Sequence, residues 1–281
     1  ALPIWRPLVK LSDHVKKFCL PTTKIFDSTT VDTPVPIVVP DKDQEYLVPP
    51  HDRYVFPSVY VAQLSNSFVY GGTNLVFTQD AVICHDLYDF ERDYTSEELH
   101  GRHLIDAKNM RMRLLRNDGT PESVEVAAAF VDACAPNYAH WMTEVLPRIA
   151  AFCSLEQFAG IPLIINDGLH RNIIESLALI CGSEREVITL PIGRALLVDR
   201  LYVTSVAGYV PFERRNEKLV GHSHGLFCPA ALELIRNKFS ADAVVFPSES
   251  KPFNSISGDS FKPLSSKWIT CFSLCFPSFI S

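Results

Sequence analysis

The chain has 281 residues, of which 47% are hydrophobic and 21% charged, and this composition is typical of a globular protein with one large core or two moderate ones. A formal net charge of −6, with no basic run to offset it, argues against a protein that binds nucleic acid unaided. No stretch of about 18 uncharged apolar residues occurs, so the sequence predicts no membrane span.

Residues 1–50 combine many prolines with few periodic apolar runs, which predicts an extended arm or linker. Within this segment, Asp41-Lys42-Asp43 matches the D-x-D pattern of some metal–nucleotide sites. Pro36 and Pro40 interrupt the apolar run before the triplet, so we interpret it as a chance match.

Residues 57–88 predict an antiparallel β meander. β-Branched and aromatic residues gather in the strings VYVAQL, SFVY, NLVFT and AVICH, and turn residues separate these at 65–66, 71–72 and 79–80. His85 and Asp86 follow the last string. A polar strand end is the simpler interpretation of this pair, and a pair of ligands is the alternative.

Residues 89–116 carry a dense run of charges, which predicts a solvated surface. His100 and His103 have the helical spacing of a metal-binding pair. No Cys or carboxylate stands at a spacing that would complete a tetrahedral site with them, so we predict no metal site here.

From residue 122 onward, apolar strands alternate with amphipathic helices. We predict strands at 124–131, 161–166, 186–190 and 195–205, and a helix at 170–181 that Gly182 closes. This alternation indicates a parallel sheet with crossover helices. In such sheets ligands bind outside the carboxyl ends of the strands.

The most informative stretch runs from Cys134 to Cys153, where a broad apolar face predicts a helix that starts at an Asn137 cap. Pro147 removes the amide that would bond to the carbonyl of Thr143, so a kink is expected near Leu146. A polar stripe flanks the apolar face, and at about 100° per residue its members share one side of the helix. The stripe consists of Asn137, His140, Glu144 and Arg148. A solvated helix edge with i,i+4 pairs is the simplest interpretation of the stripe.

The string NYAHWMTEVLPR within this helix follows the pattern N-x-x-H-x-x-x-E-x-L-P-R, which resembles the signature of the family 61 glycosyltransferases. That family includes bacterial capsular-polysaccharide enzymes, plant xylan and N-glycan pentosyltransferases, and animal O-linked N-acetylglucosaminyltransferases. The VYVA strand and the His85-Asp86 strand end are also similar to the amino-terminal segment of the family. The resemblance covers about residues 55 to 246.

The resemblance implies an α/β fold of the GT-B-like kind: a Rossmann-like parallel sheet with crossover helices, preceded by the meander. It implies an acceptor-side domain at 51–220 and the start of a carboxyl-terminal domain at 221–247. The expected activity is inverting transfer of a sugar from a nucleotide-sugar donor, a UDP-sugar, to a hydroxyl of a glycan or glycoprotein acceptor. No cofactor or metal is required for this chemistry.

His140 and Glu144 are the expected catalytic residues, since a general base must take the proton of the acceptor hydroxyl. Burial would raise the pKa of the carboxylate toward neutrality, and an imidazole already titrates there, so either residue could be the base. Asn137 and Arg148 are the expected substrate-binding residues. Arg148 either positions Glu144 or contacts phosphate.

Gly221-His222-Ser223-His224-Gly225 matches the nucleophile elbow G-x-S-x-G of α/β-hydrolases. The residues before it are too charged for the buried strand that presents such a serine. His224 is also the last histidine of the chain, whereas that fold takes its residues in the order Ser, acid, His. We therefore set the hydrolase interpretation aside.

The carboxyl end departs from the family pattern. Residues 248–281 are rich in serine, and they lack the Tyr-Ile-Ser-Arg-like strand and the His-Gly-Ala-Gly motif expected near the donor. The sequence therefore indicates an incomplete second Rossmann-like domain, truncated or frameshifted, or else a disordered tail. Loss of the donor domain would leave this chain inactive as a transferase. The alternative function is a non-catalytic fragment that binds a glycan or a partner.

The eight cysteines stand mostly among apolar residues, and no N-x-S/T sequon occurs. Both observations favour reduced thiols and a cytoplasmic protein. Association with a membrane is left open. A Golgi lumen is the alternative if an upstream anchor has been removed.

Overall fold

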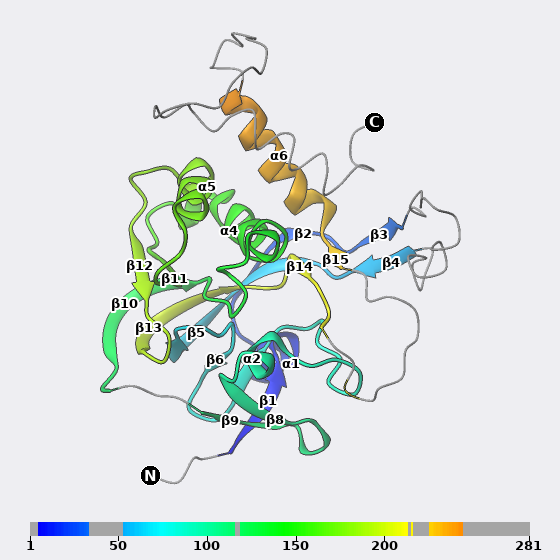
Figure 1. The fold of residues 1–281 in the computed structure, drawn as a ribbon, viewed down its shortest axis with the longest axis vertical. Coiled ribbons are helices and arrows are strands. Elements are labelled where there is room, and N and C mark those ends of the chain that lie inside the picture. Colours follow the sequence, from blue (N-terminus) through cyan, green and yellow to red (C-terminus); the bar gives the residue numbers. More distant parts are fainter. Residues whose placement is uncertain (1–4, 34–52, 116–118, 213–214, 216–224, 244–281) are drawn as a thin grey trace, which may run out of the picture. The chain divides into compact units, whose positions relative to one another are not determined.

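The computed structural model describes residues 5–33, 53–115, 119–212, 215 and 225–243 (Figure 1). The chain divides into two compact units, Ala1–Ile235 and Arg236–Ser281. The first unit is a mixed α/β structure built on one large sheet, which confirms the predicted fold class at this level. Asp41–Asp43, residues 221–224 and the tail 248–281 lie outside the described residues, so the predictions made there remain predictions.

The main sheet has the strand order β12-β11-β10-β13-β5-β6-β7-β1-β9-β8, and β2 pairs with β5 beside this path. Its strands are β1 (Arg6–Lys10), β2 (Thr22–Phe26), β5 (Val59–Tyr70), β6 (Val76–Phe77), β7 (Val82–Cys84), β8 (His103–Asp106), β9 (Arg111–Leu114), β10 (Glu122–Ala129), β11 (Leu163–Asn166), β12 (Val187–Leu190) and β13 (Ala195–Thr204). Two small sheets pair β3 (Thr29–Asp32) with β4 (Arg53–Phe56), and β14 (Gly208–Tyr209) with β15 (Leu226–Phe227).

The helical elements are mostly short. They are α1 (Leu11–Phe18), α2 (Ser96–Leu99), η2 (Ala107–Asn109), α3 (Tyr138–His140), η3 (Trp141–Val145), α4 (Leu146–Cys153), η4 (Glu156–Phe158), α5 (Arg171–Cys181) and α6 (Pro229–Ala243). No helix among the described residues is both long enough and apolar enough to cross a membrane.

The predicted parallel region is confirmed. β10, β11, β12 and β13 are mutually parallel along the sheet, with α3, η3 and α4 between β10 and β11, and α5 between β11 and β12. The chain then returns past β10, because β13 pairs with its other edge. The direction of strand progression therefore reverses at the β10–β13 pair, which is where open α/β sheets bind their ligands.

The predicted meander is right in part. Gly72 turns the chain after β5 with φ 86°, and Thr78 bonds to Ala81 across the turn after β6, as expected. The turn predicted at Ser65-Asn66 is wrong, because β5 continues through it as one strand of 12 residues. Asn66 takes φ 45° there without breaking the pairing with β13. A polar dipeptide typical of turns is held in a strand by a long neighbouring strand.

The arm predicted for residues 1–50 is wrong over its described part. Residues 6–32 form β1, α1, β2 and β3, and β1 is an inner strand that pairs parallel with β7 and antiparallel with β9. Leu8 and Leu11 are each only 2% exposed. These elements are short and their partners lie far away in the sequence, so local periodicity gave no sign of them.

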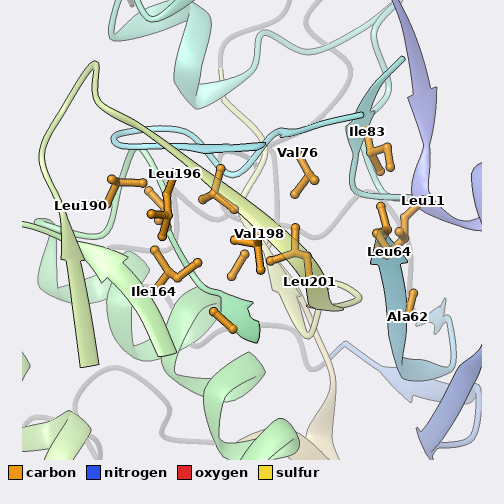
Figure 2. Close-up of a cluster of buried hydrophobic side chains, with 14 residues drawn as sticks. Leu11, Ala62, Leu64, Val76, Ile83, Ile164, Leu190, Leu196, Val198 and Leu201 are labelled. Atoms are coloured by element: carbon orange, nitrogen blue, oxygen red, sulfur yellow. The ribbon is translucent and has the colours of Figure 1, made fainter. Parts of the chain in front are cut away.

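The buried apolar residues gather in several clusters. Figure 2 shows one cluster in which Val198 and Leu201 of β13 gather with Leu64 of β5 and Ile164 of β11. Trp141 of η3 is fully buried, and its Nε1 donates to Ser176 Oγ of α5 at 2.8 Å. The six described cysteines are free thiols, three of them buried, as the sequence predicted.

Candidate active site

The helix that carries the polar stripe begins where predicted. Asn137 is its cap, and its Oδ1 accepts from the amides of Ala139 at 2.9 Å and His140 at 3.5 Å. The side chain of Asn137 is exposed, and it is not among the residues that line the cavity described below. The structure thus assigns this oxygen to the helix cap.

The helix register breaks one turn before Pro147, close to the predicted kink. Residues Trp141–Val145 form a π-helical turn, in which the amide of Leu146 donates to the carbonyl of Trp141. The carbonyl of Thr143, which Pro147 deprives of an amide partner, lies against the backbone of Gly208 in β14. A π turn inside an α-helix often marks a functional site.

The break changes how the stripe pairs. His140 Nδ1 and Glu144 Oε1 are hydrogen-bonded, as the i,i+4 spacing predicted. Arg148, however, reaches only the backbone oxygen of Glu144, and its Nη2 donates instead to Asp132 Oδ2 at 3.2 Å. The interpretation of the stripe as a solvated edge is wrong for these residues, because the side chains of His140, Glu144 and Arg148 are only 12–16% exposed.

The contact between His140 and Glu144, together with burial, shifts the pKa of both side chains upward. Burial raises the pKa of Glu144 to about 7, against the hydrogen bond from His140, which lowers it. The same hydrogen bond raises the pKa of His140. The His140 ring also stacks on Phe212, with 5.4 Å between centroids and 14° between planes. The pair is therefore a hydrogen-bonded acid–base couple whose two titrations are linked.

Asp132 is a site residue that the sequence reasoning missed. It follows β10 and is 4% exposed. Asn166, at the end of β11, holds it in place, because its Oδ1 accepts from the Asp132 amide and its Nδ2 donates to the Asp132 carbonyl, each at 2.9 Å. The signal was a lone carboxylate just beyond a buried strand of a parallel sheet, which is where such sheets bind ligands.

Glu97 is a second missed carboxylate, and it corrects the prediction of a solvated surface at 89–116. It is fully buried in α2 and accepts from the Asn74 amide and from the Tyr88 hydroxyl, each at 3.0 Å. Burial, and then the nearby Asp132 charge, raise its pKa to about 7. Asn74 Nδ2 also lies 3.3 Å from Asp132 Oδ2, so the two carboxylates share a network.

The two histidines of that segment do not form a pair. His103 is fully buried, and burial lowers its pKa to about 3. His100, the cap residue that follows α2, instead bonds through Nδ1 to the carbonyl of Ser96. Over the described residues, no three His, Cys, Asp or Glu side chains converge as a metal site would need.

These groups surround a cavity of about 30 Å³, enough for roughly two water-sized groups rather than a whole sugar ring. Its polar lining comes from the loop between β5 and β6, the loop after β7, the end of β10, the π turn and α4, and the end of β13. The polar lining residues are Asn74, His85, Asp132, Glu144, Arg148, Thr204 and Ser205. Of the four residues predicted from the helix, Glu144 and Arg148 line the cavity, and His140 contacts it through Glu144.

The pair His85-Asp86, left open between a strand end and ligands, divides into two roles. Asp86 Oδ1 accepts from the Ser12 amide at 2.9 Å and so caps α1, whose own cap residue Lys10 makes no side-chain capping bond. His85 lines the cavity, and its ring packs on Tyr88 with 3.6 Å between centroids. Only the histidine therefore belongs to the candidate site.

No family model matches this chain, and neither the curated proteins nor the solved structures include a match to it.

Proposed function

We propose that this protein is a glycosyltransferase of the family 61 type, which transfers a sugar from a UDP-sugar to a hydroxyl of a glycan or glycoprotein acceptor with inversion. The observation that carries the proposal is the buried His140–Glu144 couple, whose carboxylate has a pKa of about 7 and lines a polar cavity. A general base works best when its pKa lies near the working pH.

Glu144 is the better candidate for the base, because it lines the cavity whereas His140 is not among the lining residues. In the proposed step, the Glu144 carboxylate takes the proton of the acceptor hydroxyl as that oxygen bonds to the anomeric carbon. The bond from this carbon to the donor diphosphate breaks, and the diphosphate leaves with the electron pair. His140 positions the carboxylate and offsets its charge.

Arg148 is proposed to place a positive charge beside the Glu144 carboxylate. Its partner is Asp132, so the ion pair holds the guanidinium at the edge of the cavity beside the base. Removing either partner would leave a buried charge unpaired, which is strongly destabilising. Contact with the donor phosphate, the other role considered for Arg148, has less support because Asp132 already neutralises it.

The strand order supports a GT-B-like architecture for the first unit. β10 stands between β11 and β13, as in a Rossmann-like sheet, and the cavity lies where the strand progression reverses. In this proposal the described unit is the acceptor side. The donor side would be the second Rossmann-like domain that starts at about residue 221, whose expected donor motifs are missing from residues 248–281. The free thiols are in keeping with a cytoplasmic protein, with the Golgi lumen as the alternative.

The proposal is tested by UDP release from a panel of UDP-sugars, with and without a panel of simple glycosides as acceptors. The full chain should release UDP in an acceptor-dependent way, and Glu144→Gln should reduce this rate by about 100-fold or more. Equal rates for the two proteins would refute the assignment of Glu144.

The alternative is a non-catalytic glycan-binding protein, and one observation favours it: the cavity is complete within the described acceptor-side unit. It predicts that glycosides bind while no UDP-sugar binds or is consumed. Donor titration followed by tryptophan fluorescence distinguishes the two, since only the glycosyltransferase should show saturable donor binding.

A further inference from the structure

The cavity presents hydrogen-bonding groups that have no partner among the described residues. Glu144 uses Oε1 to bind His140, which leaves Oε2 as an acceptor. Arg148 uses Nε and Nη2, which leaves Nη1 as a donor. Thr204 Oγ1, from a residue that also lines the cavity, is fully buried without a partner among the described residues. Since buried polar groups are normally paired, these groups around one cavity indicate a polar ligand.

His85 supplies a third group, and its tautomer follows from its contacts. The Leu87 amide donates to His85 Nδ1 at 3.2 Å, so in the neutral ring the proton lies on Nε2. Burial and then the positive charge of Arg148 lower the pKa of His85 well below its ordinary value, which keeps the ring neutral. No described residue accepts from Nε2, and His85 lines the cavity.

The guanidinium that lines the cavity already has a counter-charge. Arg148 is paired with Asp132, and His140 is hydrogen-bonded to Glu144. Any ionised fraction of the buried Glu97 adds negative charge. An anionic ligand such as a phosphate or a uronate would therefore lose its hydration without gaining a counter-charge, whereas a neutral hydroxyl would not.

We propose that this cavity binds a hydroxyl group of a neutral sugar, which accepts from His85 Nε2 and Arg148 Nη1 and donates to Glu144 Oε2. The assignment rests on the proposed function, since the hydroxyl is that of the acceptor. It extends that function by making His85 a substrate-binding residue and by excluding acidic sugars at this position.

Two substitutions of His85 separate ligand binding from folding. In His85→Asn, the side-chain oxygen can replace Nδ1 as acceptor for the Leu87 amide, but no donor reaches the position of Nε2. In His85→Gln, the amide can replace Nε2–H, but the bond to Leu87 is lost. Both variants lose the ring contact with Tyr88, so this loss is common to the pair.

The measurement is the Kd of methyl glycosides of neutral hexoses and pentoses for the full chain, by saturation-transfer NMR without any donor. Wild type should bind at least one of them with a Kd in the millimolar range or below, roughly as expected for a small neutral ligand. His85→Asn should weaken binding by about tenfold or more, and His85→Gln by about threefold or less. In urea denaturation, His85→Gln should be the less stable variant.

Tyr209→Phe is a matched control. The Tyr209 hydroxyl is buried without a partner among the described residues and its ring contacts His85, yet it does not line the cavity. Removing it should leave glycoside binding unchanged. The variant keeps the ring that contacts His85, so loss of binding here would show that a group outside the cavity lining carries the affinity, and it would overturn the proposal.

Three further outcomes overturn the inference: wild-type affinity in His85→Asn, tighter binding of methyl glucuronide or inorganic phosphate than of the neutral glycosides, and no binding of any neutral glycoside. Failure of the proposed function gives a different pattern. Neutral glycosides would then bind in a His85-dependent way, but no UDP-sugar would be consumed, and the cavity would be a recognition site alone.

Discussion

Glu97 offers a direct test of the electrostatics of the site through the pH dependence of stability. The side chain is fully buried, and its pKa rises from the ordinary value of 4.5 to about 7. The folded protein therefore keeps a proton on Glu97 at pH values where the unfolded chain has lost it. The stability contributed by this proton is fully present below pH 4.5 and is lost as the pH rises toward 7.

The magnitude follows from the width of that window. It spans about 2.5 pH units, each worth about 1.4 kcal/mol, so burial of Glu97 should reduce the free energy of unfolding by roughly 3 kcal/mol between acid and neutral pH. Glu97→Gln carries no charge at any of these pH values. Between acid and neutral pH, the unfolding free energy of Glu97→Gln should therefore decrease less than that of wild type, and the difference between the two decreases should be roughly 3 kcal/mol.

The assay is urea denaturation of wild type and Glu97→Gln at several pH values between about 5 and 8. Glu125→Gln is the control, since the Glu125 side chain is 85% exposed and its loss should leave the pH dependence unchanged. If Glu97→Gln follows wild type at every pH, Glu97 is ionised in the folded protein. The network around Asp132 would then be solvated, against the burial described here.

Three more predictions concern the packing and chemistry around the π turn. Gly208→Ala would place a Cβ only 1.9 Å from the Thr143 carbonyl oxygen, so it should destabilise the protein by about 1–3 kcal/mol in urea denaturation. Unchanged stability would contradict the close contact between β14 and the π turn. Asn166→Ala removes two buried hydrogen bonds to the Asp132 backbone and should cost about 2 kcal/mol, where a wild-type unfolding curve would contradict the role given to Asn166. If Glu144 is the base, the transfer rate should rise with pH up to about 7, as its carboxylate loses the proton, and a flat profile from acid to neutral pH would speak against it.

The parallel part of the fold could be predicted because its signals are local. Each strand is a short apolar run, each helix has its own cap, and Asn137 and Gly182 stand where caps were expected. The alternation of these elements then restricts the sheet to a few arrangements. The amino-terminal strands lacked such signals, because β1 becomes an inner strand only through partners more than 70 residues away.

The site was predictable from one helix but not beyond it. The i,i+4 rule gave the His140–Glu144 contact, whereas the π turn redirected Arg148 to Asp132, a residue outside the stripe. Glu97 stood within a charged segment, where a carboxylate is usually solvated. Its burial depends on the Asn74 amide and other donors supplied by tertiary structure.

The central claim is that Glu144 is the base of a sugar transfer, and single-turnover transfer by Glu144→Gln tests it most directly. Glutamine keeps the size and a hydrogen bond to His140 but cannot take a proton. With a UDP-sugar and acceptor that wild type uses, the account predicts unchanged acceptor binding and a transfer rate reduced by about 100-fold or more. Transfer by Glu144→Gln at a rate close to that of wild type would contradict the account.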